Sequence, residues 1–333
     1  MLLRTLAFCL GLFPLFSGKS AADDLQKTAD AMLARARQLS DIRSPNAPAF
    51  RLNARLSFIG QDLETVHGTY TETWVSSSQW RRETLVGDLR RVEIGGPTRH
   101  WLIDDGKDLP EQAAPISTVL EMFPAKNANF EFESATSPDS ATQCFLTKAE
   151  GEKHLRHAFC FDKEHQVLAE TESPKAVGER FANYSCNYNE FSKFGGYFFP
   201  RKMDCLLDGH RQLEVKVVDL SPAPSPDTAL FTPPAGALEM GSCPVDPAKP
   251  TPVSTPYPMS PAGIEDRHAS VLLWLIIDIK GKPQALRISR SAGKDFDNSA
   301  LAAVRAWRFK PAACSREPMP LALGVEVKVS NHR

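Results

Sequence analysis

The sequence lacks the motifs that mark the common catalytic and metal-binding sites. It contains no G-x-S-x-G, no glycine-rich phosphate loop, no H-E-x-x-H and no C-x-x-C. His154 and His157 form an H-x-x-H, but on a strand their side chains would point to opposite faces. These absences favour a binding protein over an enzyme, and we expect neither a cofactor nor a metal ion.

Long apolar runs and long runs of one charge are also scarce. Beyond the N-terminus the most apolar stretch, 271–279, has only nine residues, whereas a membrane-spanning helix needs about 20. From Pro261 onward, 12 Lys and Arg residues stand against 7 Asp and Glu residues. This excess of positive charge is too small for a nucleic-acid-binding face, and no nucleic-acid-binding motif accompanies it. We therefore expect no nucleic-acid partner.

The first residues follow the three-part pattern of an export signal. A short basic segment, 1–4, precedes an apolar segment, 6–16, and the small residues Ser20, Ala21 and Ala22 form a cleavage site. The alternative is an uncleaved inner-membrane anchor, but the apolar segment is about half as long as a membrane span. We expect residues 1–22 to be a signal peptide and the mature protein to be periplasmic.

Six cysteines follow the expected cleavage site, an even number that suggests disulfide bonds in an exported chain. Two pairs flank the polar turn AEGEKH and the segment FSKFGGYFFP, so each could face across a hairpin. The remaining pair would tie the linker to the C-terminal domain. Spacing thus favours three bonds among the many pairings that six cysteines allow: Cys144–Cys160, Cys186–Cys205 and Cys243–Cys314.

Residues 23–220 are dominated by the alternation of apolar and polar residues that is typical of strands. In the segment 49–58, AFRLNARLSF, apolar residues occupy every second position from Phe50 to Phe58. Ten further segments of this kind follow, separated by turn-forming residues. Two helices are expected, at 24–39 and at 113–123. We predict an antiparallel β-meander that curls over a helix as a half-barrel and leaves a hydrophobic concavity.

Prolines separate this domain from the end of the chain. The stretch from Ser221 to Pro261 holds 12 of the 26 prolines. Such a density disfavours helices and central strands and favours extended polyproline II. We predict that residues 221–255 form a linker that holds two domains apart, with a reach on the order of 50 Å.

Residues 256–333 are expected to form a small ββαβ(β) domain, which makes the overall fold class α+β. In 300–312, ALAAVRAWRFKPA, the apolar spacing changes from helical to alternating at Trp307, so a helix should lead directly into a strand that Pro311 ends. Asp297 is the expected N-cap of that helix. The last strand is expected at 321–329, LALGVEVKV.

Residues 256–329 resemble the C-terminal domain of TonB. The resemblance rests on the YP of Tyr257 and Pro258, GIE at 263–265, the IDIKGKP turn, RSAG and the block A-L-x-A-V-x-x-W-R-F-K-P. The motif residues of that block are Trp307, Arg308, Phe309, Lys310 and Pro311. TonB is a periplasmic energy transducer that engages outer-membrane transporters, so the resemblance implies binding of an envelope protein or a transporter peptide. Because the expected signal peptide replaces TonB's membrane helix, it implies binding more than energy transduction.

The segments GTYTETW, QWRRE, FGGYFFPRK and ALFTPPAGA of the first domain are similar to exported half-barrels of the LolA-like lipoprotein-carrier kind. This similarity implies an alternative function, in which the N-terminal domain carries a lipid or another apolar ligand through the periplasm.

The family resemblance also implies a binding mode. In that family an extended transporter peptide adds to the sheet near the YP segment, and edge strands offer unpaired backbone groups for such pairing. We predict that a peptide, or a second copy in a homodimer, pairs with 321–329 and is flanked by Tyr257 and Pro258. The alternative is that this strand is interior or protected by Glu326 and Lys328. The predicted contact residues of the strand are Leu321, Leu323, Val325, Val327 and Val329.

Overall fold

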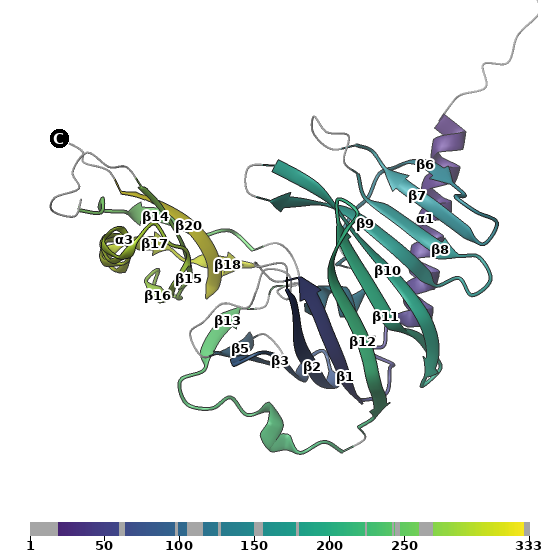
Figure 1. The fold of residues 1–333 in the computed structure, drawn as a ribbon, viewed down its shortest axis with the longest axis horizontal. Helices are drawn as coiled ribbons and strands as arrows, with labels where there is room; N and C mark the ends of the chain where they lie inside the picture. The colour runs from purple at the N-terminus through teal and green to yellow at the C-terminus, as the bar shows by residue number, and fades with distance from the viewer. Residues whose placement is uncertain are drawn as a thin grey trace, which may run out of the picture.

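The computed structural model contains a large antiparallel sheet with its helices and a smaller C-terminal domain (Figure 1). Residues 1–18 of the expected signal peptide lie outside the residues that it describes. The described ranges are 19–59, 64–96, 99–104, 116–125, 128–149, 156–177, 180–223, 225–241, 243, 247–259 and 269–329.

The first helix, α1 (Lys19–Ser40), is longer than the sequence predicted and includes the end of the expected signal peptide. Its apolar residues recur at helical spacing, with Ala29 and Ala36 almost fully buried and Leu25, Met32 and Leu33 packed against the core. α1 contacts β6, β8, β9 and β11, so it covers one end of the large sheet. The second helix, α2 (Ile116–Glu121), is shorter than predicted, and 105–115 lie outside the described residues.

Thirteen strands form the large sheet, in the order β13-β5-β4-β3-β2-β1-β12-β11-β10-β9-β8-β7-β6. Twelve of them come from the N-terminal domain: β1 (Phe50–Ile59), β2 (Thr65–Ser76), β3 (Gln79–Val86), β4 (Leu89–Gly95), β5 (Arg99–Asp104), β6 (Phe132–Thr136), β7 (Thr142–Thr147), β8 (Ala158–Asp162), β9 (Leu168–Val177), β10 (Arg180–Phe194), β11 (Tyr197–Leu207) and β12 (His210–Pro222).

The predicted meander is right within each half of this sheet and wrong at its centre. β1 to β5 form one meander and β6 to β12 form another, and the two halves join where β1 pairs with β12. Phe50 lies opposite Pro222 and Phe58 lies opposite Leu213, so this long-range pairing extends along nearly all of β1. The chain makes this join possible by leaving the first half at β5 and restarting at the far edge with β6.

The proline-rich segment is not a spacer, which corrects the prediction for 221–255. A short 3-10 helix (Thr228–Phe231) contacts β3, and Arg81 donates to the carbonyl oxygen of Leu230 at 3.5 Å. β13 (Leu238–Gly241) then pairs with β5 and forms one edge of the large sheet. β14 (Thr251–Ser254) pairs with β17 of the C-terminal domain. β13 contains no proline and both strands lie at sheet edges, so the prolines do not interrupt a central strand.

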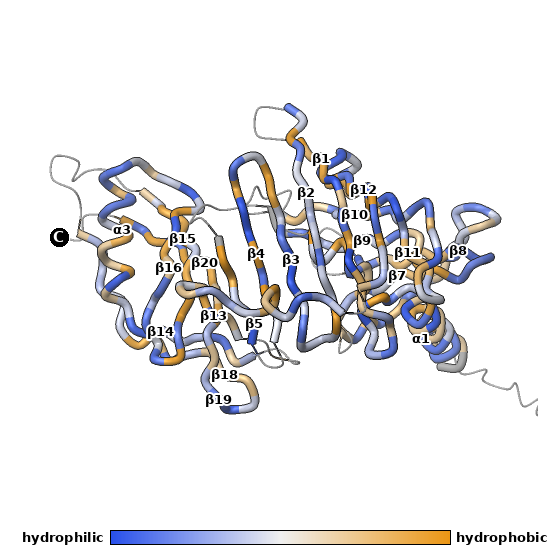
Figure 2. The backbone as a smooth tube through the Cα atoms, turned by 90° about the horizontal axis from the view of Figure 1, so that it is seen from below, coloured by the Kyte–Doolittle hydropathy of each residue, from blue (hydrophilic) through white to orange (hydrophobic). Residues whose placement is uncertain are grey.

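The C-terminal domain is built on a three-stranded sheet in the order β16-β15-β20. Its elements are β15 (Ala269–Ile277), β16 (Pro283–Arg290), α3 (Lys294–Ala306), β17 (Arg308–Lys310), β18 (Ala312–Cys314), β19 (Glu317–Met319) and β20 (Leu321–Val329). Figure 2 shows the apolar stretches of β15 and β20 beside α3, and their buried residues form one core with Phe296, Ala300 and Val304. The described structure is therefore mostly β, and the α+β prediction is confirmed only in part.

The predicted N-cap of the helix in this domain is wrong. The N-cap of α3 is Gly293, and Asp297 lies inside the first turns, where its buried carboxylate accepts from Ser291 Oγ at 2.6 Å and from Ala292 N at 3.0 Å. The helix thus begins earlier because Asp297 reaches back to the turn that precedes it. β17 does not join the main sheet but forms a two-stranded ribbon with β14 from the linker.

The structure contains the three disulfide bonds that the sequence favoured. Cys144 lies directly opposite Cys160 in the β7–β8 pair, and Cys186 lies opposite Cys205 in the β10–β11 pair. The Cα atoms of these two pairs lie 4.0 and 4.1 Å apart, because each pair sits directly across two neighbouring antiparallel strands. The third bond, Cys243–Cys314, connects residues 71 positions apart and fastens the linker to the C-terminal domain.

Candidate functional site

The first candidate site lies beside β20, which is an edge strand. β20 pairs with β15 along its whole length, from Leu321 opposite Ile277 to Val329 opposite Ala269. Among the described strands it has no partner on its other side. The prediction that 321–329 is an edge is therefore correct, and the alternative of an interior strand is wrong.

A groove of about 570 Å³ runs beside this edge, and we call it the β20 groove. The residues that line it are Pro252, Thr255, Pro256, Tyr257, Pro258, Trp307, Phe309, Val325, Glu326, Val327 and Lys328. One wall is the segment 252–258, and the opposite wall is the second half of β20. Tyr257 is 77% exposed, whereas Pro258 is buried. The groove is thus mostly apolar, with two charged residues on its strand side.

The motif W-R-F-K-P builds this groove from the end of α3. Trp307 is the C-cap residue of the helix, and its indole Nε1 donates to the carbonyl oxygen of Pro256 at 3.0 Å. Arg308 caps the helix end by donating to the carbonyl oxygens of Arg305 and Trp307, at 3.2 and 2.6 Å. Phe309 is buried, and its backbone N–H donates to Gly281 O at 2.9 Å. The helix-to-strand junction therefore positions the YP segment.

The Glu326 carboxylate beside the groove is tied to the sheet rather than placed across the edge. The Glu326 carboxylate accepts from the hydroxyl of Ser270 on β15 and from Arg290 on β16, the latter at 3.2 Å. The hydrogen bond from Ser270, with Arg290 and Lys328 nearby, holds the pKa of Glu326 below its usual value. Glu326 thus reaches over the face of its own sheet, which leaves the backbone edge of β20 less protected than its sequence suggested.

The predicted partner-binding residues are only partly brought together. Tyr257, Pro258, Val325 and Val327 line the β20 groove, whereas Leu321, Leu323 and Val329 are not among its lining residues. Val327 and Val329 are 2% and 1% exposed, so their side chains belong to the domain core. The linker residues Pro252, Thr255 and Pro256 were missed, because nothing in their sequence shows that β14 folds back onto the domain.

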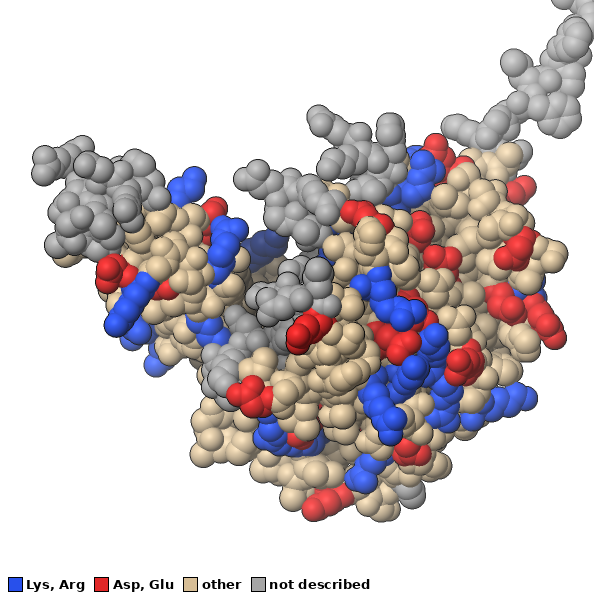
Figure 3. Space-filling view, viewed as in Figure 1, with Lys and Arg blue, Asp and Glu red and all other residues tan. Residues whose placement is uncertain are grey.

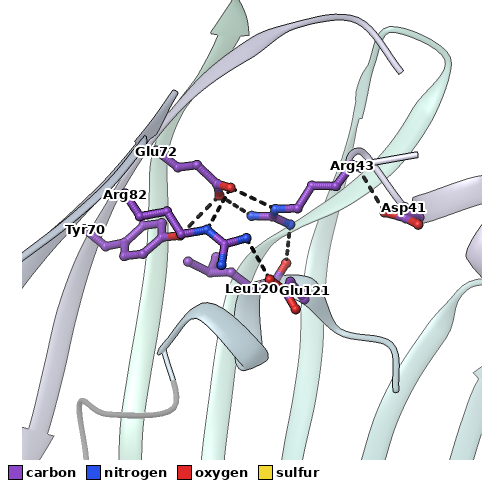
Figure 4. Close-up of polar contacts among 7 residues, drawn as sticks. All are labelled: Asp41, Arg43, Tyr70, Glu72, Arg82, Leu120 and Glu121. Atoms are coloured by element: carbon purple, nitrogen blue, oxygen red, sulfur yellow. Dashed lines mark hydrogen bonds and ion pairs between the residues drawn. The ribbon is translucent and has the colours of Figure 1, made fainter. Parts of the chain in front are cut away.

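A second candidate lies in the N-terminal domain, where a buried carboxylate bridges two arginines (Figure 4). We call it the Glu72 cluster. Arg43 binds Glu72 through two nitrogens, with Nε at 3.0 Å from Oε1, and Arg82 Nε donates to the same oxygen at 3.1 Å. Tyr70 donates its hydroxyl to Oε2 at 3.2 Å. Glu72 is 1% exposed, so this ionic group is inside the protein.

The electrostatics of the Glu72 cluster keep the carboxylate ionised. Burial by itself raises the pKa of Glu72, but the charges and hydrogen bonds of Arg43 and Arg82 outweigh burial and lower it to about 2. Burial, together with the neighbouring Glu72 charge, raises the pKa of Tyr70 well above its ordinary value. Tyr70 therefore stays protonated and acts as a donor to Glu72.

The Glu72 cluster holds separate elements together. Arg43, which follows α1, donates to the carbonyl oxygen of Leu120 in α2 at 2.9 Å, and Arg82 of β3 binds Glu121 at 2.7 Å. Sequence reasoning missed these residues, although a signal was present. Glu72 lies two positions from both Tyr70 and Trp74 in β2, so its side chain points to the same buried face of the sheet. A carboxylate that points to a buried face requires a cationic partner.

A pocket of about 670 Å³ in the N-terminal domain is lined by polar and apolar residues in equal number. It lies between α1 and the residues Pro124, Ala125 and Ala128, and its lining includes the charged residues Asp30, Arg37 and Asp41. Arg37 crosses it to donate to the carbonyl oxygen of Pro124 at 2.7 Å. The side of the sheet covered by α1 is filled by an aromatic core that includes Phe145, Phe159, Phe161 and Phe199. The lining of this pocket is therefore mixed and is not that of a purely apolar cavity.

The described residues contain neither a metal-binding cluster nor a membrane-spanning helix. They hold no group of three or more His, Cys, Asp or Glu side chains placed to bind a metal ion. None of the helices within the described ranges is both long enough and apolar enough to cross a bilayer.

The C-terminal domain is similar to a known protein family. Residues 255–328 match the model of the family described as Gram-negative bacterial TonB protein C-terminal. This match covers nearly the whole of the C-terminal domain. The matched residues agree to one position at each end with the resemblance seen in the sequence, and they contain Tyr257, Pro258, the W-R-F-K-P block and nearly all of β20. No curated protein matches this chain.

The N-terminal region is similar to solved structures of the LolA superfamily. A LolA superfamily protein from Nitrosomonas europaea has 12% identity and a TM-score of 0.43, over 62% of this chain and 97% of its own. A lipoprotein-sorting domain from Vibrio parahaemolyticus has 13% identity and a TM-score of 0.37, over 63% and 97%. A DUF1329 family protein from Desulfovibrio piger has 9% identity and a TM-score of 0.42, over 62% and 97%.

Proposed function

We propose that this protein is a non-catalytic binding protein of the bacterial periplasm, whose TonB C-terminal domain binds an extended peptide of an envelope protein along β20. The observation that carries the proposal is the β20 groove beside a strand that, among the described strands, is paired on one side only. Backbone groups on that free side offer a ladder of hydrogen bonds to an added strand. An outer-membrane transporter peptide is the partner that the family suggests.

The composition of the groove supports an extended, partly apolar peptide. Tyr257 is 77% exposed and lines the groove with Pro256, Trp307 and Val325, so a row of apolar side chains lies beside the strand. In an added strand, alternate side chains point toward this row while the backbone pairs with β20. The apolar side chains would select the peptide, and the backbone ladder would supply affinity that is independent of sequence.

The segment that forms the outer wall is held before any partner arrives. Trp307 donates to Pro256 O at 3.0 Å, and Ser299 donates its hydroxyl to the carbonyl oxygen of Met259. Prolines at 252, 256 and 258 further restrict its backbone. A wall fixed in advance lowers the entropy cost of binding a flexible peptide.

Site-specific photo-cross-linking in a Gram-negative host tests this proposal. A photoreactive phenylalanine analogue replaces Tyr257 at the groove, and the matched control replaces Gln284, an exposed residue of β16 at the opposite edge of the same sheet. We expect an envelope protein cross-linked from position 257 and not from position 284. A product of twice the chain mass would identify a homodimer, and the same products from both positions would overturn the proposal.

A proline substitution tests the strand pairing itself. Val325→Pro removes a backbone donor from β20, whereas Val327 is too deeply buried for its replacement to be selective. We expect the cross-link from position 257 to be lost in the Val325→Pro variant, with circular dichroism unchanged. A folded variant that still cross-links fully would show that the partner does not pair with β20 at this position.

The alternative of a lipid carrier remains a prediction for the N-terminal domain. The similar LolA superfamily structures motivate it, and the pocket beside α1 has a mixed polar and apolar lining that does not select between an apolar and a polar ligand. Native mass spectrometry of protein purified from the periplasm distinguishes the two functions. A co-purified lipid would support a carrier, and a lipid-free protein that cross-links at position 257 would support peptide binding alone.

A further inference from the structure

A second pocket of the C-terminal domain is lined by cations and no acidic residue. It has a volume of about 460 Å³, and we call it the basic pocket. The residues that line it are Ala248, Lys249, Thr251, Lys310, Pro311, Ala313, Ser315 and Arg316. Lys249, Lys310 and Arg316 are exposed, and none of them forms an ion pair with any residue that the structure describes. Three positive charges thus surround one pocket without a carboxylate among its lining residues.

Three separate segments bring these cations together, and each is fixed by the backbone. Lys249 lies in the linker beside Ala248, which exchanges two hydrogen bonds with Ala313 at 2.9 and 3.1 Å. Lys310 ends β17, where it lies opposite Thr251 of β14. Arg316 occupies the turn between β18 and β19, next to the Cys243–Cys314 bond. Lys249 is far in sequence from Lys310 and Arg316, and the three like charges repel one another, so their convergence is not explained by mutual stabilisation.

The basic pocket is distinct from the β20 groove. Pro252 and Phe309 are paired across the β14–β17 ribbon and line the groove, whereas the preceding pair, Thr251 and Lys310, lines the basic pocket. Neighbouring residues of a strand point to opposite faces, so the two pockets lie on opposite faces of this ribbon. A ligand in the basic pocket therefore leaves the peptide groove accessible.

We propose that the basic pocket binds a phosphate group, either on a lipid headgroup or on a soluble phosphorylated compound. A carboxylate carries one charge and two oxygens, whereas a phosphate monoester carries close to two charges and three terminal oxygens. Lys249, Lys310 and Arg316 offer charge-assisted donors to these oxygens, and Thr251 and Ser315 add two hydroxyls. The donor set matches the more highly charged anion.

Isothermal titration calorimetry of the full oxidised chain tests this site with inorganic pyrophosphate as the probe. The variant Lys310→Gln with Arg316→Gln removes two charges but retains most of each side-chain stem. The control, Lys294→Gln with Arg305→Gln, removes the same charge from exposed positions of α3. We expect the pocket variant to bind roughly 10-fold or more weakly and the control to bind as the wild type does. Binding should also weaken as ionic strength rises.

A second arm identifies the source of the phosphate. Co-sedimentation with phosphatidylcholine vesicles, with and without phosphatidic acid, measures binding to a lipid headgroup. Binding of either probe that depends on Lys310 and Arg316 supports the site and identifies its source. Absence of binding to both probes, or equal losses in the pocket variant and the α3 control, would overturn it. Photo-cross-linking from Tyr257 in the pocket variant should be unchanged, which separates this test from that of the peptide groove.

Discussion

The two domains of this protein stabilise their sheets in different ways. The N-terminal domain buries a large cluster of aromatic and aliphatic side chains between a wide sheet and α1. The C-terminal domain has a three-stranded sheet and one helix, with a core of about a third as many buried residues. A small core supplies little stability, and small domains commonly need covalent or partner support. The linker gives this support through β14, the Ala248–Ala313 bridge and Cys243–Cys314.

The domains also treat their charged residues differently. On the N-terminal sheet, Lys202, Asp204, Arg211, Glu214 and Lys216 form interlocking ion pairs at 3.0 to 4.0 Å, and Figure 3 shows such interspersed acidic and basic residues on the visible face. The Glu72 cluster pairs its charges in the interior. The basic pocket, by contrast, gathers cations whose counter-charges are not among the described residues. The ion pairs of the N-terminal domain therefore fit a structural role, whereas the unpaired cations of the basic pocket fit the proposed anionic ligand.

The largest effect is expected from the Glu72 cluster. Glu72→Gln leaves Arg43 and Arg82 buried without a counter-charge, which should lower the free energy of unfolding of the N-terminal domain by about 3–5 kcal/mol. The exposed pair Lys148–Glu131 provides the control, because solvent screens this pair and Glu131→Gln should leave the free energy of unfolding nearly unchanged. Urea unfolding followed by tryptophan fluorescence measures both. Equal losses in the two variants would contradict a structural role for the buried cluster.

The pH dependence of the free energy of unfolding should also differ between the wild type and Glu72→Gln. The pKa of Glu72 is about 2 in the folded protein and 4.5 in a model compound, so its ionised form stabilises the fold above pH 4.5. This contribution is lost as the pH falls from 4.5 toward 2. We expect the wild type to lose stability over this range more steeply than Glu72→Gln does. Parallel slopes would show that Glu72 does not titrate with folding.

An intermediate effect is expected from the bond between linker and C-terminal domain. Replacing Cys243 and Cys314 with serine should lower the stability of the C-terminal domain by about 2–4 kcal/mol, because the bond closes a long loop. Amide hydrogen exchange should rise in β14, β17 and β18 while the large sheet remains protected. Replacing Cys144 and Cys160 is the matched control, and it should affect only β7 and β8. Exchange that rises throughout the chain in both variants would contradict a local role for the linker bond.

The smallest effect is expected at Trp307. Trp307→Phe retains an aromatic ring but removes the hydrogen bond from Nε1 to Pro256 O, which should cost about 1 kcal/mol. We expect faster hydrogen exchange or proteolysis at Tyr257 and Met259, with weaker cross-linking from position 257. Trp274→Phe, in β15 of the same domain, controls for loss of an indole elsewhere. An unchanged segment 252–259 would show that the prolines alone fix the groove wall.

Local patterns predicted much of both domains. The alternation of apolar and polar residues predicted both ends of β1 to within one residue. The spacing of the cysteines around polar turns predicted two disulfide bonds across hairpins. The change of period at Trp307 located the end of α3 and the start of β17. These features were accessible because each depends on residues close together in the chain, where side-chain direction follows directly from secondary structure.

Long-range contacts were not accessible in this way. The start of α3 was misplaced because Asp297 acts as an acceptor for residues before the helix rather than as its N-cap. The linker was predicted to be a spacer because its proline content indicates only the preferred backbone conformation. Proline content does not show that β13 and β14 pair with the edge strands β5 and β17. Glu72 was overlooked because its arginine partners come from different elements.

By itself, the sequence determined where most strands and helices form, the W-R-F-K-P junction and the cysteine pairs that face across hairpins, since each follows from local geometry. Only the tertiary structure decided which strands become edges and which charges are paired. Three features require segments distant in sequence to meet. They are the free side of β20, the pairing of the linker strands β13 and β14 with β5 and β17, and the approach of Lys249 to Lys310 and Arg316. Strand order and charge pairing depend on the balance of backbone hydrogen bonds and desolvation across the whole fold, which no local pattern records.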